Sequence, residues 1–366
     1  MINPKNLRYI DQLALFKLRG IKNISLDISL EKAKNKENRY LLQEKLEQEH
    51  YKPLKTLSLL GYYSLKNYGT PYLRRNKYNN LSFSDLVARF YRDKRLRQAV
   101  LHAIEDIELT IDTKISHILG EKYGAYGYAN FFNWCQKYET NPYLYRIENG
   151  EKILGKYMDR STIRVEQRNF LRRAKKKIEK SASPDMQKFK ETHEEDDPAP
   201  IWLLVNELTL GESIHIIKLM SEENRKTVAH FFKTDIDSLM GWLECINLIR
   251  NICCHNGDLA DIKLITVPAV PNQYKKYLLF SPNGGVFTNR LALPLCIILR
   301  LINNINEKYI LTPLFAAVES LITPDVNAKY YGFRSNKKFK KLMSINNRKN
   351  KKAKEQSEIN HIHQAY

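Results

Sequence analysis

The chain has 366 residues with a formal net charge of +20, and 43% of the residues are hydrophobic. This apolar fraction is enough for a folded core, while only 14 Gly and 13 Pro argue against a turn-dense all-β protein. The Lys and Arg residues occur in clusters, which favours a polyanionic partner: nucleic acid first, and an anionic membrane surface second. The alternative is that the positive charge serves solubility alone.

The N-terminal part is predicted to be a series of helices. Residues 8–20 have the pattern of a short amphipathic helix that ends at Gly20, and residues 30–51 are charge-rich and helix-prone. The segment 52–73 carries tyrosines at positions 62, 63, 68 and 72. These side chains are either core aromatics or flat faces on which RNA bases stack.

The middle of the chain combines an apolar helix with a basic one. A long helix with an apolar stripe is predicted from residue 82 to residue 120, and the aromatic segment 121–145 is expected to be irregular. Residues 160–180 are predicted to form a basic helix. Three of its arginines recur every four residues and so share one face: Arg164, Arg168 and Arg172. With Arg173 and Lys176 they form either a track for RNA phosphates or an ordinary solvated face.

An acidic, proline-bearing segment at residues 193–200 (HEEDDPAP) is predicted to be a hinge. It separates an N-terminal helical region, residues 1–192, from a second helical region, residues 201–325. Within the second region, residues 262–289 are interpreted as a small irregular insertion with a hairpin. The remaining segments are predicted helices: 201–220, 221–232, 235–257, 290–308 and 312–322.

The longest apolar run, residues 291–302, bears on membrane association. It is too short to span a bilayer and contains Pro294 and Arg300, so we expect a buried helix and no membrane partner. The five cysteines have no disulfide-framework spacing, and the N-terminus lacks an apolar leader. We therefore expect reduced thiols and a cytoplasmic protein.

Residues 326–366 are predicted to be a basic tail. The part from 331 to 354 has ten Lys and Arg residues and no acidic residue. This composition is typical of a disordered segment, or of one that becomes ordered on an anion. Four of its lysines are candidate RNA ligands: Lys337, Lys338, Lys340 and Lys341.

The candidate catalytic residues lie near the end of the predicted helix 235–257, which Asn256-Gly257 is expected to stop. Asn251 and His255 are four residues apart and share a helical face, and Arg250 lies next to them. Histidine can deprotonate a ribose 2′-OH or protonate the leaving 5′-oxygen, and arginine can hold the phosphate and stabilise its developing charge. This set suits RNA cleavage without a metal or other cofactor.

Other arrangements of these residue types are possible. Arg97 with His102, and Arg225 with His230, have the same spacing, but these histidines lie inside amphipathic helices where packing or surface roles are expected. A zinc site would need four cysteine or histidine ligands. The nearest candidates are Cys245, Cys253, Cys254 and His255. The two adjacent cysteines diverge on a helix, and no CxxC pair exists. His361 and His363 have metal-like spacing in the tail, where solvated residues are the simpler interpretation.

Several segments together resemble one protein family. They occur in the family's order and cover most of residues 8–310: DQLALFKLRGI, LLGYYSLKNYGTPYL, FSDLVARFYRDKRLRQAVLHAIEDIELTIDTKI, PIWLLVNELTLGESIHI and LIRNICCHNG. On these segments the chain resembles the bacterial abortive-infection proteins of the AbiD/AbiF type, within the HEPN superfamily.

The resemblance implies an all-α fold: a HEPN-like helical bundle with an N-terminal helical extension. It implies an R-N-x-x-x-H ribonuclease motif at Arg250, Asn251 and His255, used without a metal and formed across a homodimer. It further implies a phage-defence toxin controlled by a structured noncoding RNA. Glu207, in a family-like segment, would help to orient the site or serve only as a charge partner. Where the family often has a second histidine, this chain has Asn256, and activity would be reduced if that histidine assists proton transfer.

Two further functions stay open on the sequence. The chain could be a non-catalytic RNA-binding protein that forms a ribonucleoprotein with a noncoding RNA, in which case Arg250 and His255 would be structural or bind phosphate. A third interpretation is a toxin that acts at a membrane surface through its basic tail.

Overall fold

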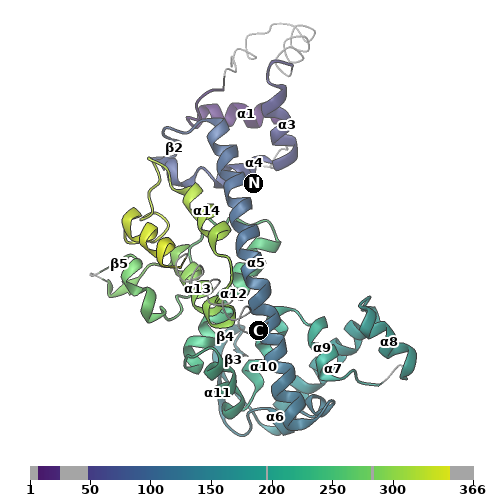
Figure 1. Cartoon of the computed structure of the whole chain (residues 1–366). Helices are drawn as coiled ribbons and strands as arrows, with labels where there is room; N and C mark the ends of the chain where they lie inside the picture. Colours follow the sequence, from purple (N-terminus) through teal and green to yellow (C-terminus); the bar gives the residue numbers. More distant parts are fainter. Residues whose placement is uncertain (1–6, 25–47, 195–196, 282–283, 347–366) are drawn as a thin grey trace, which may run out of the picture.

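The computed structural model describes residues 7–24, 48–194, 197–281 and 284–346. Helices dominate it, and the strands of these residues form two-stranded antiparallel hairpins. The predicted helical fold class is therefore confirmed. The other elements are arranged along one long central helix, α5 (Phe83–Tyr123), as Figure 1 shows.

Local sequence explains the length of α5. Its N-terminus has a capping box, in which the Ser82 hydroxyl accepts from the Asp85 backbone N–H and the Asp85 carboxylate accepts from the Ser82 N–H. The helix ends at Gly124, whose φ of 79° is unfavourable for other residues. Between these ends, apolar side chains recur every three or four residues and are fully buried: Leu96, Val100, Ile104, Ile107, Ile111 and Ile115.

The N-terminal extension packs around the first turns of α5 as a lobe with its own apolar cluster. Its elements are α1 (Tyr9–Leu18), α3 (Tyr51–Leu60), α4 (Tyr62–Asn67), η2 (Thr70–Tyr72), β1 (Leu73–Arg74) and β2 (Lys77–Tyr78). Of the four tyrosines proposed as stacking faces, Tyr62 and Tyr68 are buried in this lobe, Tyr72 is partly buried and Tyr63 is exposed. Core packing therefore accounts for the presence of Tyr62 and Tyr68 in this segment.

The segment after α5 contains a hairpin where the sequence suggested irregular structure. Its elements are η3 (Gly127–Ala129), α6 (Phe131–Trp134), β3 (Thr140–Glu148), β4 (Glu151–Tyr157), α7 (Arg160–Lys180) and α8 (Pro184–Thr192). Asn149 and Gly150 join the two strands with φ values of 50° and 82°. An Asn-Gly pair between alternating residues is a strong hairpin signal, because both residues tolerate positive φ. The expectation of irregular structure up to residue 145 was wrong for this reason.

The second half of the chain packs along α5. Its elements are α9 (Ile201–Leu204), η4 (Val205–Glu207), α10 (Leu210–Leu219), α11 (Glu222–Phe231), α12 (Ile236–Cys254), η5 (Asn272–Tyr277), β5 (Phe280–Ser281), β6 (Val286–Phe287), α13 (Ala292–Ile305) and α14 (Thr312–Leu321). The short β5–β6 hairpin lies in the predicted insertion 262–289. The main buried cluster runs from Leu96 to Leu342. Residues 193–200 therefore connect α8 to α9 without separating two cores.

The apolar run 291–302 is a buried helix, as predicted. Helix α13 has ten buried residues, including Pro294 and Cys296. In the described part of the chain, no helix has both the length and the apolar character needed to cross a membrane.

The first part of the basic tail is folded, contrary to the expectation of disorder. Residues 336–346 are helical, and Phe339 and Leu342 are each 1% exposed in the main core. Tyr331 and Phe333 are also buried. The burial of these four apolar side chains stabilises the folded segment despite its basic composition. Lys337, Lys340 and Lys341 are exposed and Lys338 is partly buried, while the tail beyond residue 346 lies outside the described residues.

Candidate functional site

The three predicted catalytic residues lie together at the C-terminal end of α12. The helix begins with Asp235, whose carboxylate accepts from the Ser238 backbone N–H at 2.7 Å, and its last turn leads to His255. Asn251 and His255 are exposed one turn apart, and the side chain of Arg250 is 32% exposed beside them. The structure therefore presents an amide, an imidazole and a guanidinium at one accessible helix end.

Asn256 ends the helix. Its φ of 56° lies in the left-handed region, and the Gly257 N–H donates to the Ile252 carbonyl oxygen at 2.8 Å. This 6→1 bond is typical of a helix C-terminus in which Asn or Gly takes the left-handed position. The side-chain oxygen of Asn256 accepts a hydrogen bond from Arg97 Nη1 at 3.0 Å. Residue 256 thus stops the helix and holds its end against α5.

Three residues of α5, each four positions apart, hold the segment that follows the motif. Arg97 binds Asn256, and one carboxylate oxygen of Asp93 accepts from the backbone N–H groups of Leu259 and Ala260 at 3.1 and 2.7 Å. Arg89 Nη2 donates to Asp261 at 2.6 Å. Because positions i, i+4 and i+8 share a helical face, the segment 256–261 lies along one side of α5.

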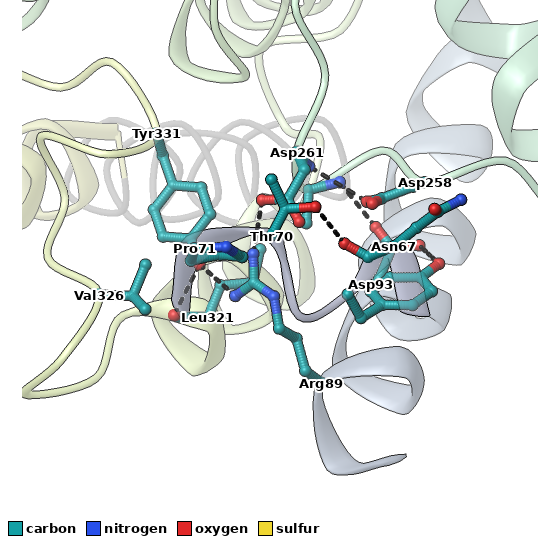
Figure 2. Close-up of polar contacts among 12 residues, drawn as sticks. Asn67, Thr70, Pro71, Arg89, Asp93, Asp258, Asp261, Leu321, Val326 and Tyr331 are labelled. Atoms are coloured by element: carbon teal, nitrogen blue, oxygen red, sulfur yellow. Dashed lines mark hydrogen bonds and ion pairs between the residues drawn. The ribbon is translucent and has the colours of Figure 1, made fainter. Parts of the chain in front are cut away.

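Arg89, Asp93 and Arg97 form a ladder of polar side chains along α5. This ladder is buried, and its hydrogen bonds continue to other parts of the fold. Asp93, which is 0% exposed, also accepts from Arg97 Nε at 3.0 Å and from the Tyr68 hydroxyl at 2.7 Å. Figure 2 shows Arg89 extending from α5 toward Asp261 and Tyr331. Arg89 donates to the Tyr331 hydroxyl at 2.7 Å, which in turn donates to a backbone carbonyl of α14. The N-terminal lobe and the C-terminal part of the chain therefore both support the motif.

Farther along α5, another side chain contacts the motif. Arg250 Nε is 3.8 Å from Glu108 Oε2, and the other oxygen of Glu108 accepts from the Leu210 backbone N–H at 3.0 Å. This is the only polar side-chain contact of Arg250 with the described residues. A long, single ion pair orients the guanidinium and leaves its remaining N–H groups for a phosphate.

One more carboxylate connects α5 to α10. The Asp112 carboxylate accepts from the Ser213 hydroxyl at 2.5 Å, and its side chain is buried. Desolvation raises the pKa of Asp112 to about 7; the hydrogen bond from Ser213 opposes this shift, and the nearby Glu108 adds to it. In the folded protein Asp112 is therefore mostly neutral only below about pH 7.

A family model described as Abi-like protein matches residues 55–261, more than half of the chain. The chain belongs to the Abi-like protein family. The matched region contains α5, α12 and all three motif residues. The predicted abortive-infection family is thereby confirmed, while the AbiD/AbiF type and the HEPN superfamily stay predictions. Searches of curated proteins and of solved structures each found no match.

Glu207 of the Abi-like protein lies away from the motif contacts. Its carboxylate accepts from the Ser181 hydroxyl at 2.5 Å, at the end of α7. Among the described residues, no hydrogen bond or ion pair joins it to Arg250, Asn251 or His255. The carboxylate that contacts Arg250 comes from Glu108 instead.

The basic face of α7 is exposed. Arg164, Arg168 and Arg172 project from the side of the helix opposite its buried residues, and none of the three forms an ion pair with the described residues. Arg173 and Lys176 line a cavity of about 380 Å³ with Lys177, Lys180 and Glu207. The predicted phosphate track is therefore available for contact, but it is separate from the motif contacts on α12.

The cysteines of α12 point in different directions. Cys245 and Cys253 are buried, Cys254 is exposed, and burial raises the pKa of the Cys253 thiol to about 12. In the part of the chain that the structure describes, no three His, Cys, Asp or Glu residues are placed to hold a metal ion. His361 and His363 lie outside the described residues.

The residues that support the motif were not predicted from the sequence: Arg89, Asp93, Arg97 and Glu108. A signal was present, because Arg89, Asp93 and Arg97 recur every four residues among apolar positions of one helix. Charged residues at core positions need partners. Which partners they meet could not be read from the helix itself.

Proposed function

We propose that this Abi-like protein is a metal-independent endoribonuclease toxin of phage defence, acting in the cytoplasm through Arg250, Asn251 and His255. One observation carries the proposal: Asn251 and His255 are exposed beside Arg250 at a helix end that a buried ladder on α5 holds in place. Reactive groups on a rigid support are a general requirement for catalysis.

The chemistry follows from these side chains. An imidazole takes the proton of a ribose 2′-OH, and the 2′-oxygen attacks the adjacent phosphorus. The bond from phosphorus to the 5′-oxygen breaks, and a second group, which acts as an acid, protonates this leaving oxygen. The products are a 2′,3′-cyclic phosphate and a 5′-OH. Arg250 binds the phosphate and stabilises the charge that develops on it, and the Asn251 amide hydrogen-bonds to it.

A homodimer would supply the acid that protonates the leaving oxygen. Each chain carries one histidine in the motif, whereas this reaction uses one base and one acid. Two copies with facing motifs would provide both. Leu248 and Leu109 are 45% and 64% exposed, one turn before Asn251 and one residue after Glu108. A second copy that faces the motif would cover these two leucines.

A structured noncoding RNA is the proposed partner that controls the toxin. The support is electrostatic: the net charge is +20, and α7 presents three arginines without ion-pair partners among the described residues. The lysines at 337, 338, 340 and 341 would form a second basic group, away from α7 in Figure 1.

The second candidate is a non-catalytic RNA-binding protein that forms a ribonucleoprotein. The observation that favours it is the same face of α7, because phosphate binding there requires no contribution from His255. In that case Arg250 would bind phosphate without cleavage.

A cleavage assay without metal separates the two candidates. The protein is purified, bound RNA is sequenced, and the wild type is compared with His255→Ala. The control is His117→Ala, which removes an exposed histidine whose ion-pair partner is Glu121. We expect the wild type and the control to cleave RNA, and His255→Ala to lose about a hundredfold or more of the rate while still binding RNA. Equal cleavage by His255→Ala would refute the proposed site. RNA binding without cleavage by the wild type, after its bound RNA is removed, would favour the second candidate.

A further inference from the structure

A second cavity opens on α5, apart from the catalytic motif. It has a volume of about 810 Å³ and lies between α5 and the residues 306–320, which include most of α14. Its α5 wall includes Arg95, Gln98 and His102. A cavity of this size can hold a planar aromatic ring.

The lining combines apolar surface with polar groups. Ala99, Pro313 and Leu314 supply apolar contacts, Gln98 and Asn306 carry amides, and Asp106 is an acceptor. Arg95 and Lys308 make the lining cationic overall. A nucleobase has apolar faces, a polar edge and adjacent phosphates, and these features match such a lining.

His102 supplies an oriented polar group. Its Nδ1 lies 2.6 Å from the Tyr309 hydroxyl. Burial raises the pKa of Tyr309 to about 12, with Asp106 and Glu105 adding to the shift, so the hydroxyl keeps its proton at neutral pH. In the tautomer that accepts from this hydroxyl at Nδ1, the His102 Nε2 is an N–H donor.

The cavity and the catalytic motif use the same stretch of α5. Arg97 contacts Asn256 and Glu108 contacts Arg250, while Gln98 and His102 line the cavity. At 100° per residue, these two cavity residues are rotated by about 100–140° from Arg97 around a helix about 10–12 Å wide. The motif and the cavity therefore lie on two flanks of one helix, and the exposed Lys94 lies between them.

We infer that this cavity is a subsite for one base of single-stranded RNA, next to the phosphate that the motif cleaves. The inference rests on the proposed function for its role in cleavage, but base binding itself does not require it. The lining is mostly apolar, and its amide and cationic side chains favour a nucleobase with its phosphates over an apolar helix of a second copy.

Photocrosslinking tests the subsite. Single-stranded RNA that carries thiouridine is bound to full-length His255→Ala, so that the RNA stays intact, and the crosslinked peptides are identified by mass spectrometry. A second protein adds Ala316→Trp, which places an indole at an exposed position of the cavity lining. The matched control adds Ala269→Trp, at an exposed position outside it. We expect crosslinks to residues 95–106 or 306–320, reduced about tenfold or more by Ala316→Trp and unchanged by the control.

The outcomes separate this inference from the proposed function. Crosslinks elsewhere, or equal crosslinking by both tryptophan variants, would overturn the subsite even where the enzyme with His255 cleaves RNA. Crosslinks in the cavity without any cleavage by the wild type would support the subsite and refute the nuclease. A change of oligomeric state by Ala316→Trp with unchanged crosslinking would assign the cavity to a second copy and overturn the inference.

Discussion

Asn256 has a structural role at the C-terminal end of α12. Its left-handed backbone ends α12, and its amide oxygen binds the buried Arg97. The Asn-Gly pair predicted the helix end, because both residues tolerate positive φ. The bond to Arg97 was not predictable, because the two residues are 159 positions apart.

Replacing Asn256 should destabilise the protein. In Asn256→Ala, Arg97 loses an acceptor and an alanine takes a left-handed conformation, which together lower the free energy of unfolding by about 1–3 kcal/mol. Asn256→Gly keeps the backbone conformation and should lose less stability than Asn256→Ala. Urea denaturation of the two variants measures the difference. An Asn256→Ala protein as stable as the wild type would contradict this role.

At the scale of elements, Asp112 makes the contact between α5 and α10 depend on pH. Folding raises its pKa from 3.8 to about 7, so the folded protein keeps a proton that the unfolded chain releases near pH 4. This contribution to stability is therefore greatest below pH 4 and decreases as the pH rises toward 7.

Asp112→Asn should remove this dependence. An amide can still accept the Ser213 hydrogen bond and carries no charge, so the variant should gain stability relative to the wild type as the pH rises from 4 to 8. Urea denaturation across this range measures the effect, with Asp185→Asn as an exposed control. A constant difference between variant and wild type at all pH values would contradict the raised pKa.

Helix α7 is the element on which RNA binding can be tested. Arg164→Ala with Arg168→Ala removes two exposed cations, and should reduce the slope of log affinity against log salt for single-stranded RNA by about 1.4. The control, Lys52→Ala with Lys55→Ala, removes two exposed lysines of α3 and should leave the slope unchanged. Filter binding at several salt concentrations measures both. Equal slopes for the two double variants would place the RNA elsewhere.

Among the elements, the long helices could be predicted, while the β1–β2 and β3–β4 hairpins were missed. Helices α5, α7 and α12 have apolar positions at helical spacing and clear N-caps. The β3–β4 hairpin had a sequence signal in Asn149-Gly150, but the aromatic residues around it were interpreted as irregular structure. The folded end of the chain was missed because its basic composition outweighed its few apolar anchors in that interpretation.

At the scale of the whole molecule, the proposed homodimer can be disrupted at one residue. Leu248→Asp places a charge at the surface beside the motif, which a second copy would have to bury unpaired. We expect the variant to be monomeric by analytical ultracentrifugation and to lose cleavage. Leu59→Asp, at a position 73% exposed on α3, should change neither. A wild type that cleaves RNA as a monomer would contradict the dimer.

The amino-acid sequence by itself determined the helical class, the long apolar helix α5, the helix that carries the motif and its stop at Asn256-Gly257. These features depend on residues within a few turns of each other, so local spacing and capping encode them. Only the tertiary structure placed Arg89, Asp93 and Arg97 against residues 256–261 and Glu108 against Arg250, across separations such as the 159 residues between Arg97 and Asn256. Those partners are chosen by how the helices pack on α5, and no local pattern specifies the outcome.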